Sequence, residues 1–326
     1  MNVCIVGGTG NISAGFAAIL LRQGHEVTLF NRGKSSPATA GVHAVTVDRG
    51  DRLTFERLAR QGKFDAAIDM ICFNRDDAQS SVRAFASVKH FIMCSTVCTY
   101  GIVSDWLPVT EDHPLRPITD YGRGKVAADA VLMEAFYKSG FPVTIIKPST
   151  TYGPKMGMPR QVAWEFTWID RIRNGKPIVV CGDGNALHQF LHVDDAALCF
   201  CNVLGRERCI GQTYNMVDRG CTTWADYHRT AMKVLGEKTE LVGVPFADLD
   251  RMNIPDFGIC KDIFAHHIYY SADKLFRDVA EFAPRISLAQ GMERVIGAMA
   301  QENRLPDCAE NTWEDGVIAA QRRVRE

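Results

Sequence analysis

The sequence lacks any apolar run that approaches the length of a membrane span, and it lacks any block of five like charges. Its formal net charge is −1 over 326 residues, which excludes a protein whose main task is to neutralise a phosphate backbone. The first residues, MNVCIVGGTG, carry no basic region, so the pattern is not that of a signal peptide. We therefore expect a soluble, cytoplasmic protein that acts on a small molecule and has no membrane or nucleic-acid partner.

The chain also lacks a CxxC pair, although it contains 11 cysteines. Scattered cysteines in apolar surroundings are typical of buried free thiols in a reducing compartment. The adjacent His266 and His267 have no third ligand at a spacing that suits a metal ion. We therefore expect no metal site.

Short apolar runs alternate with stretches of helical spacing through the first half of the chain. We expect strands at 2–6, 26–30, 44–47, 66–70, 91–94, 143–147 and 189–192, and helices at 14–23, 52–61, 76–87, 122–139 and 194–204. This alternation predicts right-handed βαβ units and the α/β class, with a Rossmann doubly wound parallel sheet and a smaller, less regular α/β substrate lobe. We assign residues 1–152 plus about 187–215 to the NAD(P)-binding Rossmann lobe. Residues about 153–186 plus 216–326 form the expected substrate-binding lobe.

A glycine-rich turn follows the first expected strand and opens the first expected helix. Its residues run Gly7-Gly8-Thr9-Gly10-Asn11-Ile12-Ser13. Glycines let the backbone approach a pyrophosphate closely, and the helix N-terminus supplies N–H groups and the positive end of a dipole. Glycines also occur in ordinary turns, so the dinucleotide-binding interpretation depends on the position of this turn between a strand and a helix. We predict a dinucleotide cofactor bound through Gly7, Thr9, Gly10 and Asn11.

The end of the second strand bears on which dinucleotide is bound. Sites selective for NAD usually place Asp or Glu there, on the ribose 2′-hydroxyl. Here Asn31 is neutral, Arg32 can grip a 2′-phosphate, and Lys34 adds positive charge. A solvated basic loop is the alternative, but the pattern favours NADP(H) over NAD(H). Asp48, after the third strand, suits a contact with the adenine amine or serves as a loop cap.

A tyrosine and a lysine stand four residues apart at the start of a helix, in Tyr121-Gly122-Arg123-Gly124-Lys125. This spacing places both side chains on one helix face. A phenol is a poor base at neutral pH, and we expect Lys125 to lower the pKa of Tyr121 and to bind the nicotinamide ribose. Ser95 and Thr96 follow a strand, where ligands bind in open α/β sheets. A Thr96 hydroxyl there can hold the substrate oxygen while Tyr121 moves a proton.

Five motifs in this order resemble the extended short-chain dehydrogenase/reductases, the NAD-dependent epimerase/dehydratase family. Residues 7–13 match the turn GGxGFIG, residues 95–101 match SSxxVYG, and Tyr121 with Lys125 match YxxxK. Residues 147–154 resemble RPxNVYGP, and residues 182–184 with 192–196 resemble GDG and VDDVA. The resemblance implies Thr96, Tyr121 and Lys125 as the catalytic trio, a Rossmann fold, and frequently a homodimer. It also implies cofactor contacts from Ile12, Asp69, Met70, Ser95, Lys125 and Pro148.

The departures from the family pattern concern the substrate. Val97 and Cys98 stand where the dehydratases carry an acidic pair, so water elimination is not expected. His188 replaces the arginine that grips the diphosphate in enzymes of UDP-sugars, and histidine is a weaker, pH-dependent anion ligand. Ser13 stands where the family turn has its third glycine. A later segment resembles a divergent branch that includes the chloroplast stem-loop RNA-binding proteins. Substrate contacts are expected from Cys98, Thr150, Tyr152, His188 and His266.

These residues predict hydride transfer, assisted by a tyrosine, on a secondary alcohol or ketone of a sugar-like substrate. An epimerase would oxidise a carbinol and reduce the other face with its cofactor kept bound, and a nucleotide-sugar 4-epimerase with bound NAD is one form of it. A reductase of secondary metabolism would consume NADPH and release its product. From another class, a non-catalytic RNA-binding or scaffold protein could retain the fold.

Overall fold

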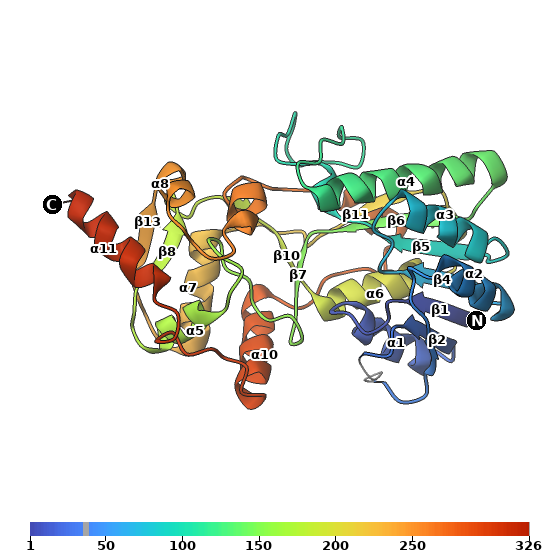
Figure 1. Cartoon of the computed structure of the whole chain (residues 1–326), viewed down its shortest axis with the longest axis horizontal. Coiled ribbons are helices and arrows are strands. Elements are labelled where there is room, and N and C mark those ends of the chain that lie inside the picture. The colour runs from blue at the N-terminus through green and yellow to red at the C-terminus, as the bar shows by residue number, and fades with distance from the viewer. Residues whose placement is uncertain (35–38, 326) are drawn as a thin grey trace. The chain divides into compact units, whose positions relative to one another are not determined.

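The computed structural model describes residues 1–34 and 39–325, and Figure 1 shows the arrangement of their helices and strands. A seven-stranded parallel sheet, in the order β11-β6-β5-β4-β1-β2-β3, forms the centre of the first of two compact units. Its strands are β1 (Asn2–Val6), β2 (Glu26–Asn31), β3 (His43–Thr46), β4 (Ala66–Asp69), β5 (His90–Cys94), β6 (Val143–Pro148) and β11 (Thr213–Met216). The order reverses between β1 and β4, the point where such sheets bind ligands.

Helices cover both faces of this sheet, as the βαβ pattern predicts. In Figure 1, α1 (Ser13–Arg22) and α6 (Val193–Val203) lie on one face, and α2 (Arg52–Gln61), α3 (Arg75–Ala84) and α4 (Asp120–Ser139) lie on the other. The first unit also contains α9 (Asp273–Asp278) and the short 3₁₀ helices η1 (Val97–Thr99) and η2 (Glu207–Cys209). The Rossmann prediction is therefore confirmed.

Side-chain caps fix where the helices on the second face begin. Asp51, Asn74 and Thr119 precede α2, α3 and α4, and each accepts a hydrogen bond from a backbone N–H of the first turn. At the other end of α4, Gly140 adopts φ +70°, which favours glycine and ends the helix.

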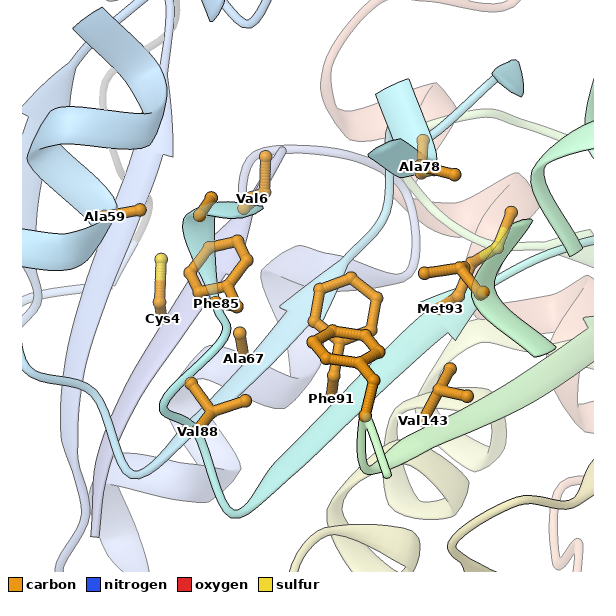
Figure 2. Close-up of a cluster of buried hydrophobic side chains, with 14 of the residues drawn as sticks. Cys4, Val6, Ala59, Ala67, Ala78, Phe85, Val88, Phe91, Met93 and Val143 are labelled. Carbon is orange, nitrogen blue, oxygen red and sulfur yellow. The ribbon is translucent and has the colours of Figure 1, made fainter. Parts of the chain in front are cut away.

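The core of the first unit lies between the sheet and α2, α3 and α4. Figure 2 shows part of it, with Phe85 and Phe91 among small and aliphatic side chains such as Ala67, Met93 and Val143. The Phe85 and Phe91 ring centroids are 5.7 Å apart. The strands β4, β5 and β6 are buried on both faces of the sheet, which explains their nearly continuous apolar runs.

The second unit is smaller and less regular. It contains α5 (Thr167–Arg173), α7 (Trp224–Leu235), α8 (Phe246–Arg251), α10 (Leu288–Gln301), α11 (Trp313–Arg325) and one π-helical turn, η3 (Cys260–Phe264). Its strands are β8 (Ile178–Cys181), β9 (Leu187–His188), β10 (Phe190–His192), β12 (Thr222–Thr223) and β13 (Leu241–Val244), while β7 (Thr150–Tyr152) begins where the first unit ends. Three two-stranded pairs, β7–β10, β8–β13 and β9–β12, join these strands.

The chain divides into two compact units. The first comprises residues 1–151, 193–217 and 270–284, and the second comprises 152–192, 218–269 and 285–326. Residues 270–284 lie with the first unit because Lys274 donates to the Thr213 carbonyl (3.0 Å) and Tyr214 donates to Asp278 (3.0 Å). The sequence pattern assigned this segment to the substrate lobe, because contacts made by single polar side chains leave no periodic signal.

Among the described helices, none combines the length and the apolar character that crossing a membrane requires. Ten of the cysteines are buried or half-buried and Cys221 is exposed, and all are free thiols.

Candidate active site

The glycine turn connects β1 to α1 with a geometry that only glycine suits at its first position. Gly7 has φ +82°, and a Cβ atom there would lie 2.7 Å from Ile71 Cγ2. Ser13, in place of the family's third glycine, holds the turn with its hydroxyl. This group donates to the Gly7 carbonyl (2.8 Å) and accepts from the Gly10 N–H (2.8 Å). The serine therefore replaces a glycine without loosening the turn.

A cavity of about 430 Å³ opens beside this turn, at the carboxyl ends of β1, β2, β3 and β4. Seven residues predicted for the cofactor line it together: Gly7, Thr9, Gly10, Asn31, Arg32, Lys34 and Asp48. Its place at the reversal of strand order matches the ligand crevice of a doubly wound sheet.

The polar groups at the end of β2 suit an anionic ligand. Asn31 Oδ1 accepts from the Gly33 N–H (2.8 Å), whereas its buried Nδ2 has no hydrogen-bond partner among the described residues. Arg32 and Lys34 line the same cavity with exposed side chains. Asp48 Oδ1 accepts from the Gly50 N–H (2.7 Å), so it caps its loop as well as lining the cavity. An open amide donor beside two cations fits a dinucleotide that carries a 2′-phosphate.

Seven predicted cofactor residues do not line the cavity: Asn11, Ile12, Asp69, Met70, Ser95, Lys125 and Pro148. Asp69 is fully buried, and its carboxylate is held by Arg49, Ser81 and the Ile71 N–H, so a direct contact of this side chain with the cofactor is contradicted. Ser95 is 1% exposed and donates to Asp129 Oδ2 (3.0 Å), which leaves only its backbone for a ligand. Both side chains are committed to buried partners that the motif did not reveal.

Sequence reasoning missed several residues of the cavity wall, above all Arg49, Ile71, Phe73 and Asp77. They come from the loop after β3, the loop after β4 and the start of α3. The sequence offered one signal for this wall, which is the arginine at position 49, directly after Asp48. A charged side chain next to the end of an apolar strand is expected to need an oppositely charged partner.

The three predicted catalytic residues converge at the ends of β5 and α4. Thr96 follows β5 and is buried, and its Oγ1 accepts from the Cys98 N–H (3.2 Å). Tyr121 lies in the first turn of α4 and is 46% exposed. Lys125, one turn later, is buried and donates to the Cys94 carbonyl (2.6 Å). Thr96 also forms a hydrogen bond with the Tyr121 phenol.

Phe73 connects this trio to the cavity wall. Its ring centroid lies 6.3 Å from that of Tyr121 and 4.9 Å from Lys125 Nζ, and it also lines the dinucleotide-sized cavity. Phe73 therefore contacts the predicted catalytic side chains and also lines the cavity.

The pKa of Tyr121 differs from the expectation. Partial burial and the neighbouring thiols of Cys94 and Cys98 raise this pKa, and the hydrogen bond with Thr96 lowers it only in part. Lys125 Nζ lies 5.8 Å from the Tyr121 ring centroid and is engaged by the Cys94 carbonyl. The predicted lowering of the Tyr121 pKa by Lys125 is therefore wrong for this structure, in which the phenol stays protonated at neutral pH.

A buried ion pair supports the loop that carries Thr96. Lys147 Nζ lies 2.9 Å from Asp129 Oδ2 and donates to Thr99 Oγ1 (2.8 Å). Thr99 in turn donates to the Thr96 carbonyl (2.9 Å). This network fixes the backbone of η1 against α4 and β6.

The five expected substrate residues have different surroundings. Cys98 is half-buried beside Thr96, and Thr150 is half-buried in β7. Tyr152 is 1% exposed within the core of the second unit. His266 Nε2 lies 3.0 Å from the Lys261 carbonyl, a local structural contact.

His188 contradicts its expected role as an anion ligand. It is 3% exposed and packs against the rings of Phe190, Trp224 and Phe264, with centroids 4.8 to 5.1 Å away. Burial lowers its pKa to about 3, so the ring is neutral at physiological pH. A neutral core histidine does not bind a diphosphate.

Comparisons with known proteins agree with this geometry. Residues 78–216 match the model of the NAD dependent epimerase/dehydratase family. The chain is 29% identical over 247 residues to 2′-dehydrokanamycin reductase of Streptomyces kanamyceticus, covering 75% of this chain and 70% of that protein. It is 27% identical over 309 residues to the chloroplast stem-loop binding protein of 41 kDa b of Arabidopsis thaliana, covering 89% and 77%.

Solved structures share the fold at low identity. A UDP-glucose 4-epimerase from Stenotrophomonas maltophila, solved with bound NAD and formylated UDP-arabinopyranose, superposes with a TM-score of 0.75 at 17% identity. The superposition covers 94% of this chain and 100% of that one. A dTDP-glucose 4,6-dehydratase from Bacillus anthracis in complex with NAD gives a TM-score of 0.72 at 18% identity, over 93% and 97% of the two chains.

Proposed function

The chain belongs to the NAD-dependent epimerase/dehydratase family of extended short-chain dehydrogenase/reductases, and from this membership we propose that it reduces a ketone on a sugar-like substrate with NADPH. The family consists of nicotinamide-dependent enzymes that modify sugars. The observation that carries the proposal is that Phe73, which lines the cavity, also packs against Tyr121 and Lys125, so the predicted proton donor lies next to the cavity wall. A nicotinamide dinucleotide bound in this cavity would supply the hydride, and the Tyr121 phenol would supply the proton.

The choice of NADPH follows from the cavity at the end of β2. Asn31 offers an open N–H donor, and Arg32 and Lys34 supply two positive charges where an NAD-selective site has a carboxylate. An acidic residue there would repel a 2′-phosphate, whereas these groups attract it.

The chain's own residues then have distinct tasks in a reduction. A bound nicotinamide dinucleotide would supply the hydride to the carbonyl carbon. Tyr121, protonated at neutral pH, donates its phenolic proton to the carbonyl oxygen, and Thr96 holds that oxygen by a hydrogen bond. Lys125 keeps its ammonium next to the Tyr121 ring and anchors α4 to β5 through the Cys94 carbonyl.

The raised pKa of Tyr121 keeps its phenol protonated, which is the form that a reduction requires. Reduction needs a protonated acid, whereas oxidation of an alcohol needs a phenolate to take up the proton. An epimerase needs both states in turn.

The substrate is proposed to be a sugar or glycoside that carries no nucleotide diphosphate. Val97 and Cys98 cannot supply the acid–base pair of water elimination, and His188 is a neutral core residue. The reductase from Streptomyces kanamyceticus is named for a substrate other than a sugar nucleotide, and it aligns over 75% of this chain. A homodimer and a cytoplasmic location complete the proposal.

The test begins with the purified protein and its cofactors. NADPH should bind at least about tenfold more tightly than NADH, and Arg32→Ala should remove most of this preference. Lys89→Ala, an exposed cation outside the cavity, is the matched control. Equal affinity for both dinucleotides in the unsubstituted protein would refute the NADPH assignment.

Turnover is then measured as NADPH oxidation with a panel of keto-sugars and keto-glycosides. Tyr121→Phe should lower kcat by about 10²-fold or more and leave the dinucleotide Kd unchanged, because it removes only the proton donor. Tightly held NAD released on denaturation, with no net NADPH consumption, would instead establish an epimerase.

A nucleic-acid-binding function is the second candidate, because the Arabidopsis stem-loop binding protein aligns over 89% of this chain. Filter binding with a structured RNA at increasing salt tests it. Affinity that falls steeply with salt and is unaffected by Tyr121→Phe would support that role over catalysis.

A further inference from the structure

Arg49 lies in the wall of the cofactor cavity with its charge between two carboxylates. It is 7% exposed, and its Nη1 lies 2.9 Å from Asp69 Oδ2 while its Nε lies 3.6 Å from Asp77 Oδ1. Its Nη2 donates to the Asp77 carbonyl (2.8 Å) and to Ser81 Oγ (2.8 Å). One guanidinium thus joins the loop after β3 to the end of β4 and to α3.

The two carboxylates shape the neighbouring part of the cavity. Asp69 Oδ1 accepts from the Ile71 N–H (3.1 Å), and Asp77 Oδ2 accepts from the Phe73 N–H (3.0 Å). Ile71 and Phe73 line the cavity, and Ile71 packs against Gly7 of the glycine turn. The acceptors therefore set the path of the backbone between the turn and the catalytic tyrosine.

The same two carboxylates would oppose an anionic ligand if they were unpaired. Asp69 is fully buried and the Asp77 side chain is 11% exposed, so water screens neither charge well. A nicotinamide dinucleotide carries a diphosphate, and its 2′-phosphorylated form carries more negative charge. The two carboxylates shape the cavity as hydrogen-bond acceptors, but their negative charges would weaken the binding of an anionic ligand unless a cation lay next to them.

We propose that Arg49 is a positioning residue that offsets one of the two negative charges of Asp69 and Asp77, so that both can shape the cavity with less repulsion of a polyanionic dinucleotide. This inference rests on the proposed function, because it concerns the same cofactor site. Arg49 acts through the two carboxylates, and its contribution grows with the negative charge of the ligand.

The experiment measures Kd for NADPH and for NADH in a set of full-length variants. Arg49→Met should weaken NADPH binding by about 30-fold and NADH binding by only about 5-fold, because the exposed negative charge acts more strongly on the more anionic ligand. Arg49→Met combined with Asp69→Asn should return NADPH affinity to within about 3-fold of the unsubstituted protein, since the asparagine amide oxygen still accepts from the Ile71 N–H. Arg49→Lys, which keeps the charge, should stay close to the unsubstituted protein.

Arg52→Met is the matched control. Arg52 Nη2 also lies near Asp77 (3.7 Å), but its side chain is 40% exposed, and its loss should change either Kd by less than about 2-fold. A thermal melt of each variant establishes that it is folded, and should Arg49→Met not fold, Arg49→Lys and the double variant carry the comparison.

If Arg49→Met weakens the binding of NADPH and NADH by the same factor, and the double variant recovers no affinity, then Arg49 has only a structural role and the inference is overturned. Unchanged affinities in Arg49→Met would also overturn it while leaving the proposed function intact. If the unsubstituted protein binds neither dinucleotide, the proposed function fails first and the inference falls with it.

Discussion

Acidification should destabilise the protein through a histidine in the second unit that has no hydrogen-bond partner among the described residues. His228 in α7 is fully buried, and neither of its ring nitrogens is paired in the part of the chain that the structure describes. The rings of Trp168 and Trp224 lie 4.9 and 6.4 Å from it, centroid to centroid. Burial, and then the charge of Arg160, lower its pKa to about 3.

The size of the effect follows from the difference between the folded and the unfolded pKa. The folded value is below the ordinary 6.5, so the unfolded chain binds a proton that the folded chain does not, and the stabilising contribution of neutral His228 is lost as pH falls below 6.5. At pH 5 the unfolded ring is protonated and the folded ring is not. About 1.5 pH units at about 1.4 kcal/mol each give a loss of about 2 kcal/mol from this one residue.

The assay compares His228→Phe with the unsubstituted protein in urea at pH 7 and pH 5. Phenylalanine retains the aromatic packing and removes two unpaired nitrogens, so stability at pH 7 should stay equal or rise. The loss of stability between pH 7 and pH 5 should be about 2 kcal/mol smaller in the variant than in the unsubstituted protein. Tryptophan fluorescence is the readout, because Trp168 and Trp224 surround the substituted site.

His188 and His90, with pKa values lowered by burial to about 3 and about 4, titrate in the same direction and are present in both proteins. Their contribution therefore cancels in the comparison. His43→Gln, at an exposed position of β3, should leave the pH dependence unchanged. An identical loss between pH 7 and pH 5 in His228→Phe and the unsubstituted protein would refute the reasoning.

Two further predictions concern stability. Glu314→Gln should lower the free energy of unfolding by about 3–5 kcal/mol in a urea titration, because it removes the buried partner of Arg160 (2.5 Å). Glu302→Gln, in a surface ion pair, should change it by less than about 0.5 kcal/mol. Similar values for the two variants would contradict the prediction for Glu314. Gly101→Ala should lower the melting temperature much more than Gly140→Ala. Both glycines have positive φ, but a Cβ at Gly101 would overlap a backbone carbonyl oxygen, and one at Gly140 meets no atom within 4 Å.

The sequence sufficed for features that local spacing encodes. The alternation of apolar runs placed six of the seven parallel strands within a residue or two but missed the edge strand β11, and the turn that begins at Gly7 and the pair Tyr121–Lys125 lie where their spacing predicted. These features depend on contacts between near neighbours along the chain or on strict motifs. The sequence therefore predicts where the cavity beside the glycine turn and the helix that carries Tyr121 and Lys125 lie.

What the sequence could not supply depends on partners far along the chain. Arg49 meets Asp69 and Asp77 only after three elements have packed together, so its role leaves no motif. His188 was expected at an anion-binding position, yet the surrounding aromatic residues make it a neutral core side chain. In the same way, the pKa of Tyr121 reflects burial and nearby thiols that its motif does not specify.

The interleaving of the two units has a consequence for synthesis on the ribosome. Each unit is assembled from three separate stretches of chain, and the last stretch of the first unit ends at residue 284. The edge strand β11, at Thr213–Met216, and the residues that bind it are therefore among the last parts of that unit to leave the ribosome. A nascent chain stalled before residue 270 would contain all seven strands but lack the stretch that binds the edge strand β11, and neither unit is encoded by one contiguous stretch of the chain.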